Sequence, residues 1–112
     1  MQHDVQKHLF DILSAARDVQ HFVDAITYDE YHGNKLVKAA VERKFEIIGE
    51  ALSRLARLSP DTASGIREHQ KIIAFRNIVI HGYDVVSDPI VWDVIQNKLP
   101  VLIGDTEKLC RS

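Results

Sequence analysis

A single cysteine, Cys110, is present among the 112 residues, so no disulfide bond can form within them. A chain with so little cysteine fits a reducing compartment. No apolar run approaches the roughly 20 residues that a helix needs to cross a bilayer. The first residues, MQHDVQKHL, lack the basic-then-apolar order of a signal peptide. We therefore expect a cytoplasmic protein with no membrane association.

Net charge is also nearly absent, and the formal value of -2 excludes a chain that is strongly basic as a whole. The charge is uneven, however. Residues 1–34 carry two basic and six acidic residues (net -4), residues 35–76 carry nine and five (net +4), and residues 77–112 carry three and five (net -2). The positive middle section could form a local groove for phosphates, or it could be a solvated helix face; the charges alone leave both interpretations open.

The composition, 46% hydrophobic and 27% charged, is that of an ordinary globular protein, and the length indicates one domain over residues 1–112. Apolar residues recur at spacings of three and four over residues 5–26 and again over residues 37–58, which predicts two amphipathic helices. The polar stretch TYDEYHGNK breaks the first pattern, and SPDTASG ends the second.

Two further helices are expected, one from near Ile66 to His81 and one that begins at SDP. In the latter, Asp88 can cap the helix and Pro89 can occupy its first turn. Pro100 should kink this last helix or end its first half. The prediction is an all-α, up-and-down four-helix bundle with a kinked or additional short C-terminal helix. In the third segment, IVIHGYDVV could instead be two short strands joined at His81-Gly82.

The third predicted helix is apolar nearly all round over residues 72–80, a pattern typical of a helix that is covered on every side. A four-helix bundle leaves each helix one outer face. A second copy of the chain is the simplest cover for this one, so we predict a homodimer whose interface includes the helix.

Polar residues interrupt this helix in the stretch FRNIVIHGYD, where Arg76, Asn77 and His81 stand among buried types. Histidine can move a proton near neutral pH, and the planar fork of arginine matches phosphate oxygens. Together they suit metal-free cleavage of RNA, in which the 2′-hydroxyl of the substrate is the nucleophile. Spacing alone favours a structural interpretation instead, with Arg76 paired to a carboxylate and His81 capping a helix end.

Two motifs carry a resemblance that covers nearly the whole chain. The segment RNIVIHGY fits R-x-x-x-x-H-x-Y, and VERKFEIIGEAL, residues 41–52, fits V-x-R-x-x-E-I-I-G-E-A. The chain resembles the HepT-like branch of the HEPN domain superfamily. The departures, Phe75 where a methionine is common and the lack of a tryptophan before the motif, do not touch the expected chemistry.

The resemblance implies a helical bundle that dimerises through its motif helices and acts as a metal-independent ribonuclease toxin of a toxin–antitoxin pair. It implies that Arg76 and His81 are the catalytic pair. It also implies that a nucleotidyltransferase antitoxin silences the toxin by adenylylating Tyr83, which the residues alone would explain equally well as a rim aromatic. No cofactor or metal is implied.

Three further residues are expected to support the site or the packing. Gly49, in the middle of a helix, predicts close helix packing, because glycine there costs up to about 1 kcal/mol relative to alanine. Glu50 is predicted to orient Arg76 or His81, the alternative being an exposed glutamate. Asn77 could bind phosphate or satisfy a buried backbone group. The remaining histidines show no metal-ligand spacing and are expected at the surface: His3, His8, His21, His32 and His69.

Two other functions remain open at this stage. The chain could be a non-catalytic HEPN module that binds a nucleotidyltransferase or a nucleotide. It could also be a purely structural bundle, in which case Arg76 would lie in an intrachain salt bridge with no cleft beside it.

Overall fold

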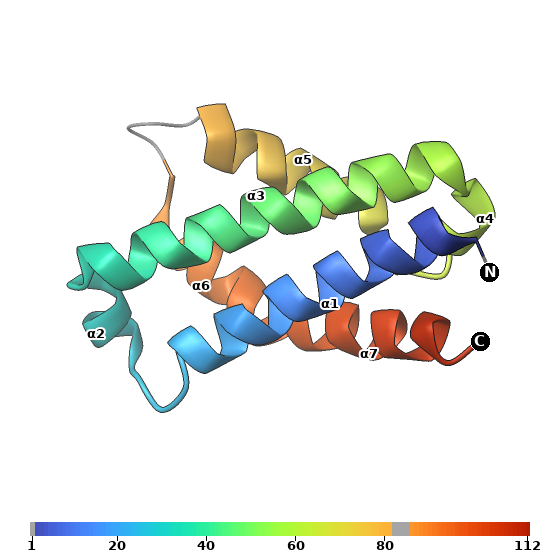
Figure 1. Cartoon of the computed structure of the whole chain (residues 1–112). Coiled ribbons are helices and arrows are strands. Elements are labelled where there is room, and N and C mark those ends of the chain that lie inside the picture. Colours follow the sequence, from blue (N-terminus) through green and yellow to red (C-terminus); the bar gives the residue numbers. More distant parts are fainter. Residues whose placement is uncertain (1, 82–85) are drawn as a thin grey trace.

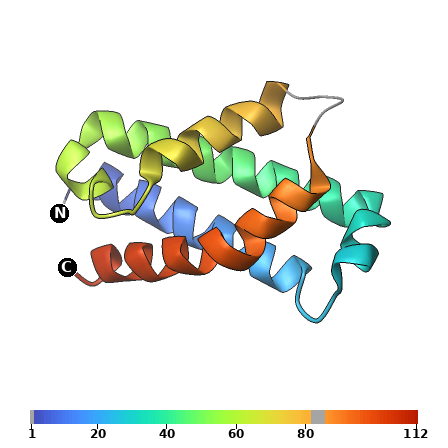
Figure 2. The same cartoon turned by 180° about the vertical axis from the view of Figure 1, so that it is seen from behind.

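The computed structural model describes residues 2–81 and 86–112, except for the side chain of His81 (Figure 1). The chain forms α1 (His3–Phe22), α2 (Tyr28–His32), α3 (Lys35–Leu58), α4 (Pro60–Ala63), α5 (His69–His81), α6 (Asp88–Asp93), the π-helix η1 (Val94–Lys98) and α7 (Leu99–Cys110). The long helices alternate in direction, and both termini lie at the same end of the bundle (Figures 1 and 2). The predicted all-α, up-and-down bundle is confirmed, and no strand occurs in the described ranges.

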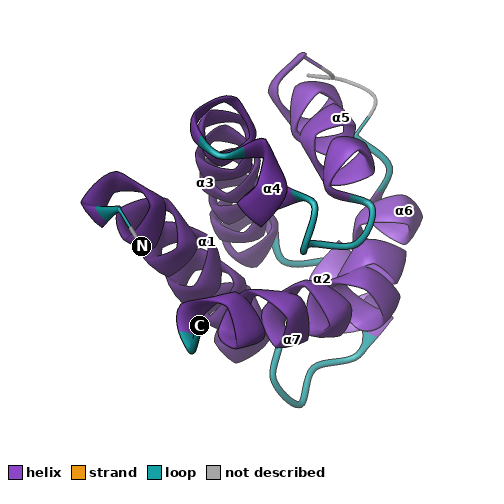
Figure 3. Cartoon of the chain, turned by 90° about the vertical axis from the view of Figure 1, so that its right-hand side faces the viewer, coloured by secondary structure: helices purple, strands orange, loops and turns teal. Residues whose placement is uncertain are grey.

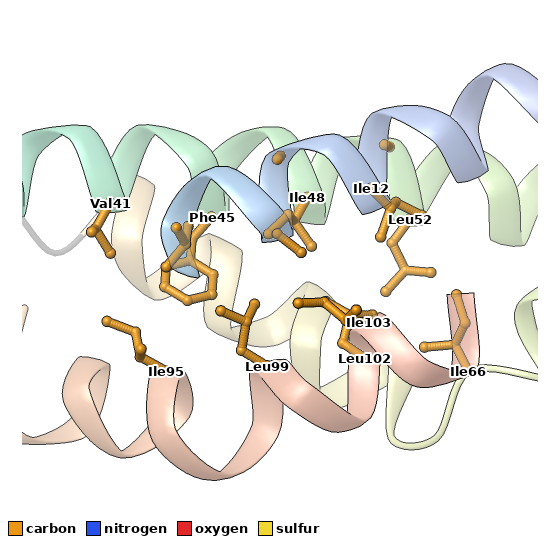
Figure 4. Close-up of a cluster of buried hydrophobic side chains, with 14 of the residues drawn as sticks. Ile12, Val41, Phe45, Ile48, Leu52, Ile66, Ile95, Leu99, Leu102 and Ile103 are labelled. Atoms are coloured by element: carbon orange, nitrogen blue, oxygen red, sulfur yellow. The ribbon is translucent and has the colours of Figure 1, made fainter. Parts of the chain in front are cut away.

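Helix α3 is the centre of the arrangement that positions the site. Seen along the bundle, α3 lies between α1 and α5 (Figure 3), and it packs against both. Its apolar stripe also faces η1 and α7 across the core (Figure 4). The buried residues labelled there are Ile12, Val41, Phe45, Ile48, Leu52, Ile66, Ile95, Leu99, Leu102 and Ile103. The two amphipathic stripes therefore build the core as predicted.

The first helix ends earlier than predicted, and the polar stretch after it contains a short helix, α2. Helix α1 stops at Phe22, and Ala25 adopts a φ of 61°, which no α-helix tolerates. Thr27 and Glu30 then form a capping box that starts α2: the Thr27 hydroxyl accepts from the Glu30 amide at 3.2 Å, and Glu30 accepts from the Thr27 amide at 2.9 Å.

Helix α5 begins at His69 rather than near Ile66, because Glu68 has a φ of 58°. The turn before it is tied to α7 by Asp105, which is only 5% exposed. Asp105 accepts from the Arg67 amide at 3.0 Å and from its guanidinium at 3.0 Å. Burial would raise the pKa of the Asp105 carboxyl, but these hydrogen bonds hold it below its usual range. The ion pair therefore fixes where α5 starts against the bundle.

The hairpin alternative is wrong for its first strand, because residues 78–81 are helical; Gly82 lies outside the described residues. After this gap, Ser87 rather than Asp88 caps α6, accepting from the Ile90 amide at 3.4 Å. The Asp88 carboxylate instead binds His32 at 2.7 Å and Lys38 at 3.1 Å. Pro89 lies in the first turn, as predicted.

Pro100 acts as expected, and the structure shows how. It has no N–H and its ring crowds the carbonyl four residues earlier, so a regular helix cannot pass through it unchanged. The chain widens into the π-helix η1 just before the proline, and α7 restarts at Leu99. The backbone therefore stays helical from Asp88 to Cys110, with a π-helical segment rather than an end between its two halves.

None of the described helices combines the length and the apolar character that a membrane span requires.

Candidate active site

The site begins with a close crossing of α3 and α5 at Gly49 and Arg76. A Cβ built on Gly49 would overlap Cβ and Cγ of Arg76 and lie 3.1 Å from its Cδ. Only glycine therefore lets the stem of Arg76 pass across α3 at this point. The close packing predicted for Gly49 is confirmed, and the atoms it accommodates belong to the candidate catalytic arginine.

The Arg76 guanidinium is held from two sides. Its Nη2 donates to Glu50 Oε2 at 2.7 Å, and its Nη1 donates to Asn77 Oδ1 at 3.2 Å. The side chain of Arg76 is 26% exposed, so the group reaches solvent while it stays fixed. The structure thus brings together three predicted site residues, Arg76, Glu50 and Asn77.

Glu50 is a charged anchor rather than a proton donor. Its other oxygen, Oε1, accepts from Arg54 Nε at 2.9 Å. The hydrogen bond from Arg54 and the nearby charge of Arg76 hold the pKa of Glu50 below its usual range. Glu50 is therefore a carboxylate at neutral pH, and both of its oxygens are used in positioning arginines.

A pocket of about 420 Å³ opens beside this arginine, and its lining residues come from α1, α3 and α5. Its walls are Lys7, His8, Asp11, Arg43, Glu46, Ile47, Glu50, Ala51, Arg54, Arg76 and Ile80. The structural interpretation predicted an intrachain salt bridge with no cleft. The salt bridge exists, but the arginine that makes it also lines an open, charged pocket.

Two predicted site residues cannot be placed as fully. His81 is the last residue of α5, one residue beyond the pocket-lining Ile80, and its side chain lies outside the described residues. Tyr83 lies outside them altogether. Their roles stay predictions.

Sequence reasoning missed several pocket residues, among them Lys7, His8 and Asp11 of α1. His8 was expected at the surface, but it is half-buried, and its Nδ1 is buried with no hydrogen-bond partner in the described part of the chain. No spacing rule in the sequence indicates this placement. It follows from how α1 is rotated against α3, which only the packed structure defines.

Comparison with known proteins identifies the family. The family model described as Ribonuclease HepT-like matches residues 12–109. The chain belongs to the HepT-like ribonuclease family. Among its relatives, "Putative RNase MJ1380" of Methanocaldococcus jannaschii is 32% identical over 104 residues, covering 93% of this chain and 94% of the relative. "Probable ribonuclease HepT" of Thermococcus cleftensis is 28% identical over 113 residues, covering 97% and 98%. No solved structure matches the chain.

Membership in the HepT-like family agrees with the position of the two motifs. The polar residues of the α3 motif, Arg43, Glu46 and Glu50, all line the pocket that Arg76 of the α5 motif also lines. Two segments that are separate in the sequence thus contribute to one surface. Ribonuclease activity is the chemistry of the family to which this surface belongs.

Proposed function

We propose that this protein is a metal-independent endoribonuclease whose Arg76 and His81 cleave RNA in a cleft between two copies of the chain. The observation that carries the proposal is the fixed Arg76 guanidinium beside an open pocket, on the helix that ends at His81. Family membership supports the ribonuclease activity.

The chemistry needs only these two groups and the substrate. The 2′-hydroxyl oxygen attacks the phosphorus, the bond from phosphorus to the 5′-oxygen breaks, and a 2′,3′-cyclic phosphate forms. One imidazole accepts the proton of the 2′-hydroxyl, and the leaving 5′-oxygen takes a proton from an imidazolium. Arg76 stabilises the negative charge that builds on the phosphoryl oxygens. In a dimer, the two copies of His81 can divide the roles of base and acid.

The outer face of α5 supports the dimer. Ile78 is 55% exposed and Ala74, one turn earlier, is also exposed, so apolar surface remains uncovered next to the site residues. A second α5 would bury this surface and bring each Arg76 and His81 toward its counterpart.

Metal independence is tested on the isolated protein, after sedimentation has measured its mass. The dimer should cut single-stranded RNA in excess EDTA at an undiminished rate and leave 2′,3′-cyclic phosphate ends, which mass spectrometry identifies. A monomer of 12.7 kDa at micromolar concentration would contradict the dimer cleft. Activity that EDTA abolishes and Mg²⁺ restores would contradict the mechanism.

The same RNA cleavage assay distinguishes the proposed ribonuclease from the second candidate function, a non-catalytic binding module. A non-catalytic module would bind a nucleotidyltransferase and leave RNA intact even as a pure dimer. A module that binds a nucleotide could use Arg76 as well, so we propose the catalytic role because the family to which the chain belongs is one of ribonucleases.

We further propose that the protein is the toxin of a toxin–antitoxin pair and that a nucleotidyltransferase antitoxin adenylylates Tyr83. A nucleotide two residues from His81 would fill the RNA site and repel its phosphates. Incubation with such a partner and ATP should add adenylate mass to Tyr83 and abolish RNA cleavage. The Tyr83→Phe variant should gain no mass and keep cleaving. Inhibition of Tyr83→Phe to the same extent would rule out this residue as the target.

A further inference from the structure

Two residues that line the pocket beside Arg76 each carry a buried nitrogen without a hydrogen-bond partner. In the described part of the chain, three buried side-chain polar atoms lack a hydrogen-bond partner: His8 Nδ1, Arg76 Nε and Tyr31 Oη. Two of these three belong to residues that line the pocket. A buried polar group without a partner is costly, so an acceptor in the pocket toward which either side chain can turn would relieve that cost.

The charged groups around these nitrogens favour an anion. The pocket is lined by four fixed cations, Lys7, Arg43, Arg54 and Arg76, and by three carboxylates, Asp11, Glu46 and Glu50. The balance is therefore one positive charge before His8 is counted. Arg76 supplies this excess charge at the reacting phosphate, so a neighbouring phosphate would be held by Lys7, Arg43 and Arg54 turning away from their carboxylate partners.

The ion pairs within the pocket are easily exchanged for a ligand. Lys7 binds Asp11 at 2.8 Å and Arg43 binds Glu46 at 3.1 Å, each within one helix turn. The side chains of Lys7, Arg43 and Arg54 are 61%, 68% and 58% exposed. Exposed pairs of this kind contribute little to stability, so their cations are free to turn toward a phosphate.

The pocket is long enough to hold a short stretch of single-stranded RNA. Arg43 and Arg54 lie 11 residues apart on α3, which places them on nearly the same face and about 16 Å apart at 1.5 Å per residue. Glu50 lies between Arg43 and Arg54 on α3, and it binds the guanidinium of Arg76. A single strand of RNA that runs along α3 would therefore pass the candidate catalytic arginine and extend beyond it.

We infer that this pocket holds the RNA phosphate next to the one that is cleaved, and that His8 is the positioning residue that donates a hydrogen bond to it. The inference rests on the proposed function, since it assigns part of the same substrate. His8 acts on binding and alignment of the strand, while Arg76 and His81 act on the reacting phosphate.

Binding is measured with a fluorescein-labelled decamer of 2′-fluoro ribonucleotides, which has no attacking hydroxyl and stays intact. His8→Ala should raise its Kd about tenfold, because a hydrogen bond to a charged group is lost. His8→Asn, whose amide can reach the position of Nδ1, should restore most of the affinity. His21→Ala is the matched control, a substitution at an exposed histidine on the same helix outside the pocket, and should leave the Kd within twofold.

Cleavage of ordinary RNA gives a second readout. His8→Ala should raise KM about tenfold and leave kcat within about twofold, the pattern expected when uniform binding is removed. Thermal melts of each variant show whether folding is intact. In the unsubstituted protein, the imidazole carbon resonance of His8 should shift on titration with the decamer while that of His21 stays fixed, so the test does not depend on how a variant folds.

Failure of the inference differs from failure of the proposed function. If the protein cuts RNA, and His8→Ala binds and cleaves as the unsubstituted protein does with no shift of the His8 resonance, then the inference alone is overturned. If the unsubstituted dimer does not cut RNA at all, the proposed function fails, and the inference fails with it.

Discussion

Replacing Gly49 with alanine should both destabilise the protein and disturb its site. The added Cβ would overlap the stem of Arg76, so either the two helices move apart or the arginine changes rotamer. Overpacking of this kind costs about 1–3 kcal/mol. Urea unfolding should show this loss, and RNA cleavage should fall with it because the guanidinium leaves its place beside Glu50.

A second glycine provides the control. Gly104 lies within α7, is exposed, and would meet nothing within 4 Å of an added Cβ. Gly104→Ala should stabilise the protein by about 0.5–1 kcal/mol through helix propensity alone, with cleavage unchanged. Equal unfolding midpoints for the two alanine variants would contradict the packing role of Gly49.

The long helices could be predicted because their apolar stripes are long and regular. Gly49 was also informative, since a glycine inside such a stripe carries a cost that close packing explains. The short helix α2 was missed although its signal was present: Thr27 and Glu30 have the spacing of a capping box, which acts locally and does not depend on an apolar stripe.

Arg76 could be predicted from its motif, but the residues that surround it in the pocket were harder to predict. A motif on one helix indicates which residues are chemically suited to a reaction. It does not show which other helices face them. The contact between Arg76 and Glu50 spans 26 residues, and the place of His8 in the same pocket depends on the packing of a third helix. The predicted link from Glu50 to Arg76 came from the motif, whereas nothing in the sequence indicated His8.

Substitutions of the two candidate catalytic residues should have the largest effect on activity. His81→Ala should reduce the rate of RNA cleavage by a factor on the order of 10²–10⁴, because a general acid or base is lost. Arg76→Ala should reduce it by a factor on the order of 10²–10³, because charge on the phosphate is no longer stabilised. Single-turnover cleavage of a labelled RNA measures both rates.

The Arg76→Lys variant tests geometry apart from charge. Arg76 uses two different nitrogens for Glu50 and Asn77, and a lysine ammonium cannot reproduce that planar fork. We expect Arg76→Lys to recover little of the activity lost in Arg76→Ala. Recovery to within threefold of the unsubstituted rate would show that a positive charge alone is enough.

The control for His81→Ala is His3→Ala, since the His3 side chain is 93% exposed and does not line the pocket. Both variants should melt within a few degrees of the unsubstituted protein, so that a loss of rate in one reports chemistry rather than folding. Because the two catalytic groups act on one phosphate, the double substitution should cost much less than the product of the single effects. Cleavage by His81→Ala at the unsubstituted rate after repeated purification would remove His81 from the mechanism.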